Sequence, residues 1–157
     1  MNVHAIFEGS DGEATRALYA RLEAFGPVGI VAMNLFRAQK CSSRAKVYRA
    51  GRFRRDAYER KTWSLTNLAQ VLEAHGAELG LRWGWKVDPQ QERHCWVLYV
   101  DLPQGQVSFH MGARGKGPDY DGDWDGSHKS PGRVVTFVSK VLNSPTDAAL
   151  SGVERKS

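Results

Sequence analysis

The fold is decided by the stretch CWVLYVDLPQGQVSFH, residues 95–110. Its first half is a nearly continuous apolar run and its second half alternates apolar and polar residues, a pattern typical of two β-strands. Pro-Gln-Gly at 103–105 predicts a tight turn between them. The preceding stretch LRWGWKV, residues 81–87, also alternates and predicts a strand. Together these segments predict a three-stranded antiparallel meander.

The hairpin register predicts which side chains share a face of this sheet. If residues 104–105 form a two-residue turn, Asp101 faces Ser108 and Tyr99 faces His110, and apolar residues face apolar residues. Arg82 and Lys86 are expected beside this polar set, on the first strand. The predicted core face consists of Trp96, Leu98, Val100, Leu102, Val107 and Phe109.

Helical periodicity flanks the strands on both sides. A capping box at residues 10–13 starts an apolar stripe that Gly26-Pro27 ends, and a second helix follows over 28–48. Residues 49–62 have no clean period and are interpreted as a loop, before a third helix over 64–75. Ser130-Pro131 begins the last helix. The order ααα-βββ-α predicts an α+β protein with about four helices.

Length and composition are those of one globular domain. The chain has 157 residues, of which 41% are hydrophobic and 25% charged. We expect a single domain over residues 1–142 and a flexible tail over 143–157. The sequence lacks an apolar run of about 20 residues and a signal-peptide pattern, so the expected location is the cytoplasm, without a membrane partner.

Positive charge is concentrated in residues 37–61. The chain carries a net charge of +5, but this segment contains ten basic and two acidic residues, so it alone is strongly cationic. Such asymmetry is typical of a protein with a phosphate-rich partner. The predicted phosphate-binding residues are Arg37, Lys40, Arg44, Lys46, Arg49, Arg52, Arg54, Arg55, Arg60 and Lys61.

Aromatic residues lie between these cations. Tyr48, Phe53 and Tyr58 are candidates for stacking on bases, and Trp63 follows them. Cations that neutralise phosphates together with aromatic rings suit single-stranded nucleic acid or a nucleotide. Two alternatives remain: the aromatic residues fill the core while the cations are solvated, or the segment contacts a protein that mimics or handles nucleic acid.

A second candidate site combines the polar sheet face with an acidic loop. Asp101 and His110 form a candidate acid–base pair, because a carboxylate commonly orients a histidine base. Four aspartates alternate along the loop, and Mg²⁺ or Mn²⁺ would relieve their repulsion. The simpler interpretation is a turn-rich loop whose acids pair with the basic segment. The predicted metal ligands are Asp119, Asp121, Asp123 and Asp125.

Four stretches carry a resemblance: NLFRAQKCSSRAK at 34–46, WVLYVDLP at 96–103, GQVSFH at 105–110 and WDG at 124–126. Together they resemble a group of small hypothetical proteins of bacteriophages and bacterial mobile elements, over roughly residues 30–126. That group has no assigned activity, so the resemblance transfers no catalytic residue. It implies a genomic setting in which accessory proteins act on host nucleic acid or host defence.

The sequence therefore predicts an accessory binding protein with a polyanionic partner. That partner is nucleic acid, a nucleotide or a host defence complex that handles nucleic acid, and an anti-CRISPR-like inhibitor is one specific form of this hypothesis. Binding of this kind requires no cofactor. The alternative is a metal-dependent phosphodiester or nucleotide hydrolase, which would use Mg²⁺ or Mn²⁺. A third hypothesis is an adaptor whose charges serve solubility and partner choice.

Overall fold

The computed structural model describes residues 1–9, 12–48, 55–88, 95–111 and 129–143, and within them it has the predicted α+β architecture. Four helices precede a three-stranded meander and one helix follows it, so the described chain has one helix more than predicted. The elements are α1 (Val3–Glu8), α2 (Gly12–Glu23), α3 (Pro27–Tyr48), α4 (Arg55–His75), β1 (Arg82–Asp88), β2 (Cys95–Leu102), β3 (Gly105–Met111) and α5 (Ser130–Asn143).

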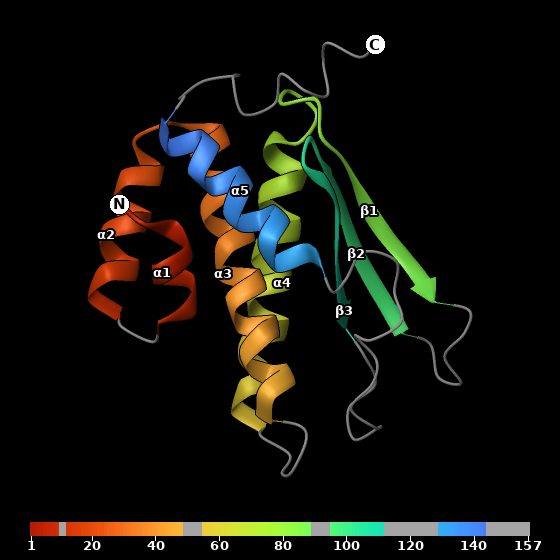
Figure 1. The fold of residues 1–157 in the computed structure, drawn as a ribbon. Coiled ribbons are helices and arrows are strands. Elements are labelled where there is room, and N and C mark those ends of the chain that lie inside the picture. The colour runs from red at the N-terminus through yellow and green to blue at the C-terminus, as the bar shows by residue number, and fades with distance from the viewer. Residues whose placement is uncertain (10–11, 49–54, 89–94, 112–128, 144–157) are drawn as a thin grey trace.

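The elements are arranged in layers around α3 (Figure 1). Helices α3, α4 and α5 form the middle layer, with α1 and α2 on one side and the sheet on the other. The first half of α3 is buried on several sides. A helix that is apolar all round is buried all round. Its fully buried residues are Val31, Ala32, Leu35, Phe36 and Ala38.

Helix α1 is absent from the sequence-based prediction. It has six residues, and the Asn2 side chain caps it by accepting a hydrogen bond from the Ala5 amide at 3.0 Å. Helix α2 ends at Glu23, three residues before the predicted stop at Gly26-Pro27, and Gly26 takes a left-handed conformation (φ 76°). Helices α2 and α3 approach each other closely near this turn, because a Cβ built on Gly29 would lie 1.8 Å from the Leu22 carbonyl oxygen.

Helix α4 begins at Arg55, nine residues before the predicted start at Ser64. The predicted loop is therefore wrong for residues 55–62, while 49–54 lie outside the described residues. Ser64 is buried inside the helix, and its hydroxyl donates to the Lys61 carbonyl at 2.9 Å. The helix ends as predicted at His75. Gly76 follows the helix, and close approach requires a glycine there, because a Cβ would lie 2.6 Å from the Leu72 carbonyl oxygen and 3.2 Å from the Trp83 ring.

The sheet has the predicted order and the predicted faces, but its hairpin register differs by two residues. Leu102 pairs with Gly105 and Asp101 with Gln106, so the turn is Pro103-Gln104 and not residues 104–105. Gly105 has a φ of 126°, which explains why it closes the turn as a strand residue. A shift of two residues preserves the alternation of faces, which is why the predicted core face survives the error.

The core face packs against the helices, and one of its predicted members is exposed. Leu98, Val100 and Phe109 are buried in the main hydrophobic cluster. Trp96 is the exception, since 48% of its surface is accessible. On the opposite face Ser108 and His110 are buried.

Helix α5 supports the outer edge of the sheet. Ser130 at its start accepts a hydrogen bond from the Ser108 amide at 3.2 Å, and Arg133 donates to the Gln106 carbonyl. The Arg133 side chain lies across Gly105, where a Cβ would come within 2.6 Å of its Nε atom. These contacts satisfy backbone groups of an edge strand and so stabilise the observed register. Residues 144–157, most of the predicted tail, lie outside the described residues.

Candidate functional site: a cationic cleft between three helices

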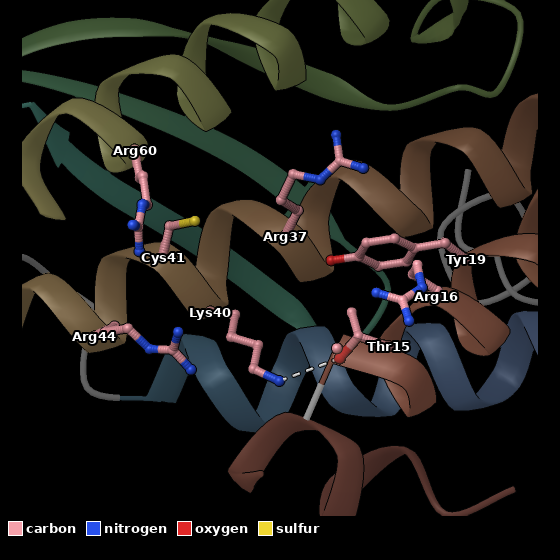
Figure 2. A pocket seen from close by; sticks show the side chains of 9 residues that line it. Thr15, Arg16, Tyr19, Arg37, Lys40, Cys41, Arg44 and Arg60 are labelled. Atoms are coloured by element: carbon pink, nitrogen blue, oxygen red, sulfur yellow. Dashed lines mark hydrogen bonds between the residues drawn. The ribbon is translucent and has the colours of Figure 1, made fainter. Parts of the chain in front are cut away.

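A cavity of ≈ 270 Å³ lies between α2, α3 and α4 (Figure 2). We call it the cationic cleft. Five of its nine lining side chains are basic, and no lining residue within the described part of the chain is acidic. Its volume is just below the range of about 300–1,000 Å³ that is usual for small-molecule sites. The lining residues are Gly12, Thr15, Arg16, Tyr19, Arg37, Lys40, Cys41, Arg44 and Arg60.

Helical spacing brings these residues together. Residues three, four and seven positions apart lie on one face of a helix. The α2 residues Gly12, Thr15, Arg16 and Tyr19 have this spacing, and so do the α3 residues Arg37, Lys40, Cys41 and Arg44. The two stripes face each other across the cavity, and Arg60 reaches in from α4 (Figure 2).

Lys40 connects three helices through contacts of its side chain. Its ammonium donates to the Ile6 carbonyl at 2.8 Å, which lies in the last turn of α1, and it lies 3.5 Å from the Thr15 hydroxyl of α2. It also lies 5.8 Å from the centroid of the Phe36 ring. A cation at the carboxyl end of a helix interacts favourably with the helix dipole. Lys40 therefore has a structural role in addition to its charge.

Arg37 is held between two aromatic rings. Its guanidinium carbon lies 5.0 Å from the centroid of the Tyr19 ring on α2 and 5.5 Å from that of the Trp63 ring on α4. Both distances are within the range of cation–π attraction. The two rings fix the orientation of a side chain that would otherwise be flexible, so its charge is preorganised at the wall of the cleft.

Tyr19 supplies an uncharged hydrogen-bond donor, its phenol, beside Arg37 in the cationic cleft. Burial raises the pKa of its phenol above the usual value of 10.0, and the positive charge of Arg37 opposes this rise without cancelling it. The phenol therefore stays protonated at neutral pH. Its hydroxyl points toward Arg37 in the cleft (Figure 2).

The described lining of the cleft concentrates positive charge and contains no acid. Arg16 folds over the first turn of α2, where a Cβ on Gly12 would lie 3.2 Å from its Nη1 atom, and the amino end of a helix is itself partly positive. Cations that line one cavity repel one another, and an anion between them reduces this repulsion. The arrangement therefore favours an anionic ligand.

The structure brings together four of the predicted phosphate-binding residues: Arg37, Lys40, Arg44 and Arg60. Lys61 is buried and does not line the cleft. Sequence reasoning missed Arg16, Thr15 and Tyr19, which precede the basic segment. Arg49, Arg52, Phe53 and Arg54 lie outside the described residues, as do the side chains of Lys46, Tyr48, Arg55 and Tyr58.

The predicted acid–base pair is not assembled by the observed register. Asp101 pairs with Gln106, whereas His110 pairs with Val97. Four strand residues thus separate the two along the sheet, or roughly 13 Å at about 3.3 Å per residue. The Asp101 carboxylate instead accepts a hydrogen bond from the side-chain Nε2 of Gln106 at 2.8 Å and lies 3.8 Å from the Arg82 Nε atom. Its carboxylate is compensated by these neighbours and does not orient His110.

The predicted metal ligands fall outside the part of the chain that the structure describes. Asp119, Asp121, Asp123 and Asp125 lie between residues 112 and 128, so a metal site there stays a prediction. Among the described residues, no group of three or more His, Cys, Asp or Glu side chains is placed to hold a metal ion.

Comparisons with known proteins return no match for this chain, whether to a family model, a curated protein or a solved structure. None of the described helices is both long enough and apolar enough to cross a membrane.

Proposed function

We propose that the protein is a nucleic-acid-binding protein and that the cationic cleft holds phosphate groups of its ligand. One observation carries the proposal: five cations from three helices converge on one cavity whose described lining contains no acid. Charges that serve only solubility need not be gathered around one cavity. Phosphates are the anions that a polyanionic partner presents in closely spaced series.

The chemistry of the lining supports phosphate in particular. Four of the five cations are arginines, whose planar guanidinium groups donate two parallel hydrogen bonds to phosphate oxygens. Thr15 and the protonated Tyr19 add neutral hydroxyl donors. In the setting that the resemblance implies, such binding would serve contact with host nucleic acid or with a defence complex that handles it.

The test is a comparison of two double variants that lose the same net charge. Arg16→Gln with Arg44→Gln removes two cations from opposite walls of the cleft. Arg21→Gln with Arg82→Gln removes two exposed cations outside it. Fluorescence anisotropy with labelled single-stranded DNA and RNA, over a series of salt concentrations, measures the affinity of each protein.

The cleft variant is expected to bind about thirtyfold more weakly, which corresponds to about 1 kcal/mol for each cation. The slope of log affinity against log salt should also fall by about 1.4, or about 0.7 for each lost phosphate contact. The control variant should stay within about threefold of the wild type. Equal losses in both variants, or no binding by the wild type at low salt, would overturn the proposal.

A further inference from the structure

Trp63 is an exposed ring held beside the cationic cleft. More than half of its surface, 57%, is accessible, and the Arg37 guanidinium lies 5.5 Å from the ring centroid. Trp63 follows Arg60 by three residues on α4, so both side chains lie on the same face of that helix. Arg37 and Arg60 line the cleft, and Trp63 therefore continues its wall outward.

The contact with Arg37 gives this ring a defined orientation. A cation–π pair limits the rotation of the indole, and a ring that is already oriented loses less entropy when a ligand stacks on it. Arg37 also contacts the Tyr19 ring at 5.0 Å, which anchors the guanidinium to α2. Trp63 is thus an oriented aromatic surface that is open to solvent and adjacent to a phosphate-binding cavity.

From this juxtaposition we infer that Trp63 is a stacking platform for an unpaired base whose phosphate lies in the cationic cleft. This inference rests on the proposed function and names its ligand class, which is single-stranded nucleic acid. One guanidinium separates the aromatic surface from the cavity, a separation that a single nucleotide spans. Phosphate neutralisation combined with stacking on aromatic rings is how proteins bind single strands.

A nucleic-acid duplex cannot stack a base on Trp63 in this way. Its bases are paired and stacked on one another, so they cannot lie on an indole without being extruded. The cations of the cleft would still attract duplex phosphates, but the contribution of Trp63 would be lost. The protein should therefore bind a single strand more tightly than a duplex of the same length, by about 5- to 100-fold for one stacked base.

The experiment uses three variants of the full chain. Trp63→Leu removes the aromatic ring, and Trp63→Phe keeps a smaller one. Trp96→Leu is the matched control, because Trp96 is similarly exposed, at 48%, and lies on the sheet. Affinity for labelled oligothymidylate is measured by anisotropy over a salt series, and quenching of tryptophan fluorescence on binding reports stacking. Thermal unfolding checks that each variant is folded.

The expected result is that Trp63→Leu weakens single-strand binding about 5- to 100-fold, leaves the salt slope unchanged and abolishes most of the quenching. Trp63→Phe should retain part of the affinity, and Trp96→Leu should behave as the wild type. An unchanged salt slope excludes an indirect effect through Arg37, because loss of a cation would lower that slope.

Two results would overturn the inference while leaving the proposed function intact. One is salt-dependent binding that Trp63→Leu weakens no more than Trp96→Leu does. The other is equal affinity of the wild type for the single strand and the duplex. Failure of the wild type to bind any nucleic acid at low salt would instead overturn the proposed function itself.

Discussion

The cationic cleft and the outer face of the sheet both carry arginine and lysine, but their charges are arranged differently. On the sheet, Arg82 lies 3.8 Å from the Asp101 carboxylate, which also accepts a hydrogen bond from Gln106. Lys86 lies 4.6 Å from the centroid of the Tyr99 ring. Each of these cations therefore has a partner within the described structure.

The cleft combines five cations with a cavity whose described lining contains no acid. The difference teaches that the number of basic residues does not identify a binding site in this protein. The arrangement around a cavity does, because one anion there can contact several cations of the described lining at once. Variants of each region can break or sharpen this distinction.

The largest expected effect on stability comes from Gly29, where α3 approaches α2. Alanine at this position would place a Cβ 1.8 Å from the Leu22 carbonyl oxygen, a backbone atom that cannot move alone. We expect Gly29→Ala to lower the free energy of unfolding by about 3 kcal/mol and to weaken nucleic-acid binding, because the two stripes of the cleft would separate. Urea unfolding and anisotropy measure the two effects.

The control for this prediction is Gly132→Ala in α5. A Cβ at Gly132 would meet no atom within 4 Å, so alanine should stabilise the helix by up to about 1 kcal/mol without altering binding. If Gly29→Ala has wild-type stability, the close contact between α2 and α3 does not exist as described.

The second prediction separates structural from binding cations within the cleft. Lys40→Met removes an ammonium that donates to Ile6 at 2.8 Å and should cost about 1.5 kcal/mol of stability. Arg44→Met should change stability by no more than about 0.5 kcal/mol, although both variants bind nucleic acid more weakly. Thermal unfolding distinguishes them, and equal melting temperatures for the two variants would contradict the role assigned to Lys40.

The smallest expected effect is that of Asp101→Asn on the sheet. The variant removes the carboxylate that lies 3.8 Å from the largely exposed Arg82 side chain, so stability should change by at most about 1 kcal/mol. Affinity for nucleic acid should be unchanged, because the sheet face is not the binding site. A clear gain in affinity, measured by anisotropy, would show instead that compensation on the sheet masks a second site.

The sequence predicts the meander, helices α3 and α5 and the faces of the sheet, because these depend on local periodicity and on turn residues. The register of the hairpin is wrong by two residues because Pro103-Gln104 forms the turn, and the closing Gly105 fits against Arg133 from a distant helix. The start of α4 is missed because charged residues hide its helical period. The first error arises where a tertiary contact overrides a local signal, and the second arises where the local signal itself is weak.

The sequence predicts only part of the candidate site, because the lining residues come from helices that are brought together by folding. The charge of residues 37–61 indicates Arg37, Lys40 and Arg44, but nothing local to that segment points to Arg16 or Tyr19. The matching spacing of Gly12-Thr15-Arg16-Tyr19 and Arg37-Lys40-Cys41-Arg44 is a signal that is visible in the sequence. Its meaning depends on α2 lying against α3, which only the folded structure reveals.

The central claim is that nucleic acid occupies the cationic cleft, and the thiol of Cys41 reports on it directly. Cys41 is a half-buried free cysteine in the wall of the cavity. The measurement is its rate of alkylation, followed by peptide mass spectrometry at low salt, with and without a saturating single-stranded oligonucleotide. We predict that the bound oligonucleotide slows alkylation of Cys41 in proportion to the occupied fraction. An unchanged rate at full saturation would contradict the account, because the ligand would then lie elsewhere on the protein.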